Sequence, residues 1–215
     1  MDIKQRETSI TTILDFLEEH PRMFSTRKRK NIPDPTTKEG KSSIRKTIET
    51  SMDKTIIPLT PRTVPDGAVF QIMENYYGVD GSKKEEIEKQ HQYAMAAEDV
   101  VGALLEEYIS SKAIRYNLIK CHGDIVKGTD FIRRENNNLF LLQVKNRNNS
   151  ENSSSASIRG FLNKDQGVVI EKWFRTFALT GKTNWENFPD DALCNSLNEK
   201  DFRSFVLEYL TNIKT

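Results

Sequence analysis

Long apolar runs are absent from this sequence of 215 residues, and cysteine, proline and glycine are scarce. No segment approaches the roughly 18 consecutive apolar residues that a membrane helix requires, which argues against a membrane protein. The first twenty residues, MDIKQRETSITTILDFLEEH, are too polar for a secretion signal. Cys121 and Cys194 provide neither a disulfide framework nor the spacing of a zinc site. We therefore expect a reduced, cytoplasmic protein that folds as a single domain.

Net charge is also low, because 32 bases almost balance 31 acids, but the charges are segregated along the chain. Residues 20–62 carry +7 and residues 108–175 carry +6, whereas residues 63–107 between them carry −7. Two basic stretches on a nearly neutral protein indicate a surface that faces a polyanion, with solvated charge as the alternative. The stretch RKRKNIPDPTTKEGKSSIRK, residues 27–46, suits phosphate contacts or is a solvated loop.

Hydrophobic periodicity predicts four helices: one before Pro21, one from about residue 42, one over 83–110 and one over 199–211. Strand-like runs follow the longest helix at 113–121, 129–134 and 138–146. After them we expect an amphipathic helix that turns four apolar side chains inward: Val169, Trp173, Phe174 and Phe177.

The segment TDFIRRENNNLFLLQVKNR, residues 129–147, predicts a hairpin that gathers polar groups. Asp130 heads the first strand, and Gln143 and Lys145 share one face of the second because strand side chains alternate. A carboxylate and a neighbouring oxygen ligand can hold a hard divalent cation. Such a cation stabilises charge at a scissile phosphate and lowers the pKa of its bound water, and Lys145 can orient or deprotonate that water. The pattern is typical of metal-dependent phosphodiester hydrolysis.

A further carboxylate comes from the long helix. At 100° per residue Glu98 falls within its apolar face, where a charge is costly unless it is paired or bound to a metal. The other residues of that face are Ala94, Ala97, Val101, Leu104, Leu105 and Tyr108. Glu98 is therefore the predicted additional ligand, with a structural ion pair as the alternative and Glu106 as the next candidate. Asp124, in CHGD, is a weaker alternative to Asp130.

These residues resemble the PD-(D/E)xK nuclease superfamily, with Thr129–Asp130 and QVK at 143–145 as the two halves of its motif. The helix motif AxxxExxV, residues 94–101, is similar to the superfamily helix whose Glu often joins the metal site. Three further segments look like the SinI-type restriction endonucleases in particular: QVKNRNNSENSSSASIR at 143–159, EKWFR at 171–175 and TNWENF at 183–188.

The resemblance implies an α/β fold with a central mixed β-sheet flanked by helices. Residues 1–215 would form one endonuclease domain, with a helical and basic region at 1–82 and the catalytic core at 83–215. It implies a homodimeric type II restriction endonuclease that uses Mg²⁺ to cut double-stranded DNA at a short palindromic site of the GGWCC kind. Glu98, Asp130 and Gln143 would bind the metal, and Lys145 would serve the attacking water.

One departure stands out, since Gln143 occupies the position where the superfamily usually has a carboxylate. This departure leaves open the alternative that the protein binds DNA without cutting it. The scaffold alone also fits a repair or junction-resolving nuclease. For base recognition we expect the polar stretch that leaves the catalytic strand, although its composition alone would indicate a linker. The predicted DNA contacts are Arg147, Asn148, Asn149, Asn152, Ser153, Ser154, Ser155 and Arg159.

Overall fold

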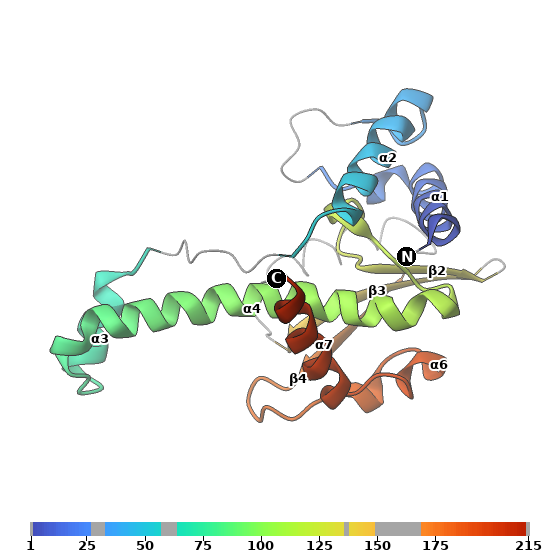
Figure 1. Cartoon of the computed structure of the whole chain (residues 1–215). Helices are drawn as coiled ribbons and strands as arrows, with labels where there is room; N and C mark the ends of the chain where they lie inside the picture. Colours follow the sequence, from blue (N-terminus) through green and yellow to red (C-terminus); the bar gives the residue numbers. More distant parts are fainter. Residues whose placement is uncertain (1, 27–32, 57–63, 136–137, 149–168, 214–215) are drawn as a thin grey trace.

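A computed structural model describes residues 2–26, 33–56, 64–135, 138–148 and 169–213 (Figure 1). Its centre is a mixed sheet, as the resemblance implied, and the strands lie in the order β1-β2-β3-β4. The strands are β1 (Ile119–Lys120), β2 (Phe131–Glu135), β3 (Asn138–Arg147) and β4 (Ile170–Thr176). The first three pair antiparallel, whereas β3 and β4 run parallel.

Helices cover both faces of the sheet, which confirms the predicted α/β class. One face carries α1 (Ile3–Glu19) and α2 (Lys38–Met52), whose Ile13 and Ile44 share an apolar cluster with Ile132 and Leu141 of the strands. The other face carries the end of α4 (Lys84–Ala113), α6 (Asp191–Cys194) and α7 (Glu199–Asn212). The apolar side chains of that second cluster include Leu105, Tyr108, Phe131, Leu142, Val144, Trp173 and Phe202.

Ion pairs join α1 to α2. Arg45 donates two hydrogen bonds to Glu7, and the ammonium of Lys41 lies 2.5 Å from a carboxylate oxygen of Glu18. Both bases belong to the stretch 27–46 that was predicted to contact phosphate or remain solvated. The structure instead engages these two bases within the chain; residues 27–32 of that stretch lie outside the described part.

Two secondary-structure predictions are wrong. Residues 170–176 form a strand, because the β-branched and aromatic side chains of IEKWFRT suit a ladder with β3 that buries Trp173 and leaves Val169 exposed. Residues 113–116 are not a strand, because α4 continues to Ala113 and a 3₁₀ turn follows it. A further helix, α3 (Gly67–Asn75), starts at an Asp66 cap and was not predicted.

The long helix α4 is buried over only part of its length. Leu104, Leu105 and Tyr108 are buried as predicted, but Ala94 and Ala97 of the same face are exposed. Figure 1 shows why, since the first half of α4 runs beyond the sheet together with α3. In the described residues, no helix is both long and apolar enough to cross a membrane.

Candidate active site

Main-chain hydrogen bonds fix Asp130 at the entrance to β2. Its N–H donates to the carbonyl of Leu142 at 2.8 Å, and its own carbonyl accepts from the N–H of Cys121 at 2.7 Å. Its carboxylate Oδ2 accepts the N–H of Val144 at 2.7 Å. The backbone on both sides of Asp130 therefore holds this side chain against β3.

The strand register brings Gln143 and Lys145 to the same place. Phe131 pairs with Leu142, so Asp130, one residue earlier, lies level with Gln143 on β3. Alternation then puts Lys145 on the same face as Gln143, and its positive charge lowers the pKa of Asp130. The structure thus assembles the three hairpin residues, while their catalytic roles stay a prediction.

The carboxylate that α4 contributes beside Asp130 is Glu106, not Glu98. The side chain of Glu98 is 60% exposed, and its carboxylate lies 3.6 Å from the guanidinium of Arg147. The expectation that Glu98 lies on a covered face is wrong, because α4 meets the sheet only after that residue. Glu106, the next candidate, is partly buried, and the negative charge of Asp130 acts on it.

Burial makes these two carboxylates poor acids. Burial, followed by the charge of Asp130, raises the pKa of Glu106 to about 7, against the opposing effect of the Lys120 ammonium. Burial also raises the pKa of Asp130 to about 6, although the Val144 N–H and the charges of Lys145 and Lys120 lower it. Two desolvated carboxylates in electrostatic contact form an arrangement that a cation stabilises.

Lys120 on β1 is a charged neighbour that the sequence reasoning missed. It is only 8% exposed, and its Nζ donates to Glu107 at 2.7 Å and lies 3.4 Å from Glu106. The signal that could have found it is a charged residue where the pattern requires an apolar one, here a lysine in the run LIKC. The same signal drew attention to Glu98. The flanking His122 is buried, and burial with the charge of Lys120 lowers its pKa to about 4.

The donor set fits a hard divalent cation if Gln143 takes part. Gln143 is 8% exposed, and its Oε1 has no hydrogen-bond partner among the described residues. A buried amide oxygen without a donor is costly, and a cation would satisfy it. Nowhere in the described chain do three His, Cys, Asp or Glu side chains suffice for a metal by themselves. Asp130, Glu106 and the amide oxygen of Gln143 are therefore the residues that could hold one.

Asp124, the alternative to Asp130, is exposed on the turn after β1 and raises the pKa of Asp130 through its charge. Of the predicted DNA contacts, only Arg147 and Asn148 lie in the described chain. Arg147 is half exposed and pairs with Glu98, and Asn148 Oδ1 accepts the N–H of Ala178. The remaining predicted contacts lie outside the described residues: Asn149, Asn152, Ser153, Ser154, Ser155 and Arg159.

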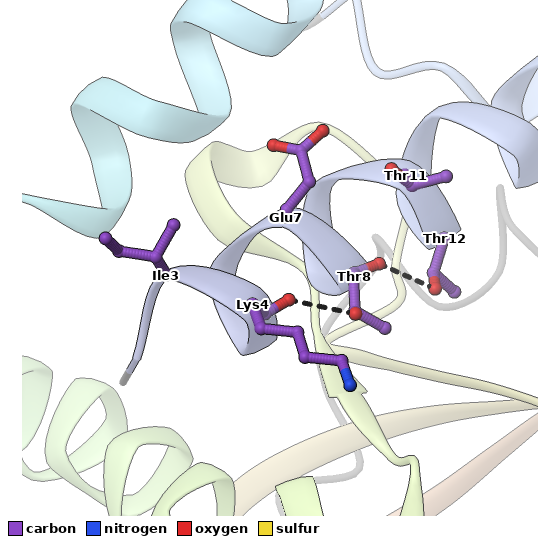
Figure 2. Close-up of a pocket in the computed structure, with 6 residues that line it drawn as sticks. All are labelled: Ile3, Lys4, Glu7, Thr8, Thr11 and Thr12. Carbon is purple, nitrogen blue, oxygen red and sulfur yellow. Dashed lines mark hydrogen bonds between the residues drawn. The ribbon is translucent and has the colours of Figure 1, made fainter.

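An open hollow elsewhere has no comparable chemistry. It lies along α1, and Figure 2 shows its lining, in which Thr8 and Thr12 donate to main-chain carbonyls one turn earlier. Its one acid, Glu7, is held by Arg45. The residues that line the hollow therefore lack the side chains that hydrolysis requires, and the hairpin of β2 and β3 remains the candidate site.

Comparison with known proteins identifies the family of this chain. The profile of the SinI restriction endonuclease family matches residues 1–212. The type II restriction enzyme Eco47I of Escherichia coli is 44% identical over 158 residues, which are 73% of this chain and 66% of the relative. The type II restriction enzyme SinI of Salmonella infantis is 43% identical over 159 residues, with the same coverage. The match thus spans just under two thirds of each relative, and by its family profile the chain belongs to the SinI restriction endonuclease family.

Proposed function

We propose that this protein is a type II restriction endonuclease that hydrolyses double-stranded DNA at a specific site. The observation that carries the proposal is the register of the β2–β3 hairpin, which sets Asp130, Gln143 and Lys145 side by side while Glu106 approaches from α4. Membership of the family and the names of both relatives support the same activity.

In this proposal Asp130, Glu106 and the Oε1 of Gln143 hold Mg²⁺. The bound ion would supply charge stabilisation at the scissile phosphate and a lowered pKa for a bound water. Lys145 orients the attacking water and offsets the negative charge that builds on the phosphate. Lys145 also favours the ionised form of Asp130, because its charge lowers the pKa of that carboxyl.

We further propose that residues 1–215 form one endonuclease domain that acts in the cytoplasm as a homodimer. The packing of α1 and α2 onto the same sheet as the catalytic hairpin supports a single domain. A two-fold protein suits a palindromic site. Arg147, the last residue of β3, is an arginine donor of the kind that suits the guanines of a GGWCC-like sequence.

Digestion of a plasmid by the purified protein with Mg²⁺ tests the activity. We expect discrete, reproducible fragments from the wild type and no cleavage by Asp130→Ala or Lys145→Ala. Lys200→Ala is the matched control, since Lys200 is exposed on α7 and should leave the fragment pattern unchanged.

Three results would contradict the proposal. Undiminished cleavage by either hairpin variant would overturn the mechanism. Preference for branched substrates over duplex sites would point to a repair or junction-resolving nuclease. DNA binding without a product under any divalent cation would mean that Gln143 marks an inactive site.

A further inference from the structure

The last part of β3 is held in the sheet from one side only. In the part of the chain that the structure describes, β3 pairs with β2 as far as Leu142, whereas residues 145–147, here called the singly paired end, pair with β4 alone. Lys145 and Arg147 lie in this end and share one face of the strand. Strand ends that few contacts hold open most readily, so a fixed position for Lys145 requires additional contacts here.

Four side chains supply those contacts and are here called the Arg175 cluster: Asn146, Arg175, Trp185 and Glu199. Arg175 of β4 lies level with Asn146 in the ladder, and its Nε donates to Asn146 Oδ1 at 3.0 Å. Its Nη1 donates to both carboxylate oxygens of Glu199, at 2.8 and 2.9 Å. The indole N–H of Trp185 donates to the same carboxylate at 3.1 Å. Arg175 thus joins the first turn of α7 to the middle residue of the singly paired end.

Burial and charge give Arg175 one orientation. The side chains of Arg175 and Glu199 are 13% and 21% exposed, and the guanidinium carbon of Arg175 lies 5.0 Å from the ring centroid of the buried Phe202. Burial by itself would raise the pKa of Glu199, but the hydrogen bonds from Arg203, Arg175 and Trp185 lower it. Glu199 is therefore ionised at neutral pH, and hydrogen bonds to an ionised acceptor are stronger than those between neutral groups.

Two segments that the catalytic proposal does not use meet in this cluster. EKWFR at 171–175 supplies Arg175, and TNWENF at 183–188 supplies Trp185. The N–H of the buried Asn184 donates to the main-chain carbonyl of Arg175 at 2.8 Å. Neither segment contributes a ligand to the candidate metal site, but together they hold both the main chain and the side chain of Arg175.

We propose that Arg175 is a positioning residue for Lys145: through Asn146 it fixes the singly paired end and thereby the direction in which the Lys145 side chain leaves β3. The inference rests on the proposed function, since it takes Lys145 to serve the water that attacks the phosphate. A displacement of about 1 Å in a reacting group can reduce a rate about 100-fold, so a residue can control the rate without contacting the substrate.

Amide hydrogen exchange of the DNA-free protein tests the contact itself. We expect residues 145–148 to exchange about tenfold faster in Arg175→Ala and in Asn146→Ala than in the wild type, because the singly paired end opens more often. Asn146→Ala is the milder change, since it removes the contact with β3 but leaves Glu199 paired with Arg175.

Arg133→Ala is the matched control for a general loss of stability. It also separates an arginine from a buried carboxylate, that of Asp190, but Arg133 lies opposite Phe140, far from the singly paired end of β3. Exchange at residues 145–148 should therefore stay at the wild-type rate in this variant.

Single-turnover cleavage of duplex DNA at saturating Mg²⁺ tests the consequence for Lys145. The rate should fall about tenfold or more in Arg175→Ala and in Asn146→Ala, and the double variant should be no slower than Arg175→Ala, because both changes remove the same contact. Arg133→Ala should cleave at the wild-type rate. The affinity of the DNA-free protein for Mg²⁺ should change less than about twofold in every variant, because the candidate metal ligands precede the singly paired end.

Wild-type exchange at residues 145–148 in both variants would overturn the inference, whether or not the protein cuts DNA. Wild-type cleavage by both variants would also overturn it, and so would an equal decrease in Arg133→Ala, which would make reduced stability the cause. A wild type that cuts no DNA would overturn the proposed function instead. Faster exchange in Arg175→Ala and Asn146→Ala would then still show that Arg175 fixes the end of β3.

Discussion

Proton competition at the candidate metal site gives the sharpest quantitative prediction. A divalent cation binds the ionised carboxylates, so each proton held by Asp130 or Glu106 must leave before the cation binds. With pKa values of about 6 and about 7, both groups are largely ionised at pH 8, but at pH 6 Asp130 is half protonated and Glu106 is mostly protonated. Each carboxylate scales the affinity by the fraction of it that is ionised. The product of the two fractions predicts that the affinity for Mg²⁺ falls about 20-fold from pH 8 to pH 6.

Substitution of the helix carboxylate separates the two contributions. In Glu106→Gln only Asp130 still titrates in this range, and loss of the neighbouring negative charge lowers its pKa, so the decrease from pH 8 to pH 6 should shrink to about twofold at most, with weaker binding at both pH values. Glu98→Gln should retain the 20-fold decrease, because Glu98 is exposed and pairs with Arg147.

Isothermal titration calorimetry of the DNA-free protein with MgCl₂ or MnCl₂ measures these affinities. Repeating the titration in buffers of different ionisation enthalpy counts the protons released on binding. The reasoning would be refuted if affinity were flat between pH 6 and pH 8 in the wild type. A loss of both metal binding and pH dependence in Glu98→Gln, with Glu106→Gln unaffected, would refute the assignment of the helix ligand.

Three further predictions concern stability. Without metal, the unfolding free energy should decrease as pH rises from about 4 to 7, because the folded state binds protons more tightly at Asp130 and Glu106 than the unfolded chain does, while the lowered pKa of His122 offsets only one of these two groups. Urea unfolding at several pH values checks the sign. Arg133→Ala removes the cation that pairs with the buried Asp190 carboxylate and should lower the unfolding free energy by about 3–5 kcal/mol in the same assay. An equal decrease in the Arg133→Ala, Asp190→Asn double variant would show that an unpaired Asp190 charge is not the cause. Trp173→Ala should cost about 3–5 kcal/mol, because the buried indole also donates to a main-chain carbonyl, and an unchanged denaturation midpoint would contradict it.

The hairpin of β2 and β3, which forms the candidate site, was predictable from the sequence because its signal is local. Asp130, Gln143 and Lys145 lie within 16 residues, and the alternation of a strand fixes the face of each side chain. The turn ENNN separates two runs of strand-forming residues, so the pairing of the two strands followed directly.

The helix carboxylate was not predictable in the same way. Periodicity showed that Glu98 lies on the apolar face of α4, but it could not show where the sheet beneath that face ends. Only the tertiary position of α4 reveals that the face is covered from Leu104 onward and uncovered before it. Lys120 was missed for a related reason, since its partners, Glu106 and Glu107, are neighbouring residues of α4, which only the tertiary structure brings beside β1.

The strand β4 shows a limit of another kind. Its apolar residues fit a helical spacing as well as a strand, and a segment of seven residues is too short for period alone to decide. The ladder with β3, which lies more than twenty residues earlier in the chain, determines the outcome.

The hydrogen bond from the Val144 N–H to the Asp130 carboxylate has a consequence for the order of folding. Most of the candidate site forms as soon as two neighbouring strands pair, at the low entropic cost of closing a short loop. Glu106 arrives only when α4 docks. In a folding intermediate with a paired hairpin and an undocked α4, Asp130, Gln143 and Lys145 would therefore be in position. The Glu106 carboxylate, the candidate metal ligand from the helix, would be missing. Completion of the site would then report the docking of α4, and metal affinity would measure how far folding has advanced.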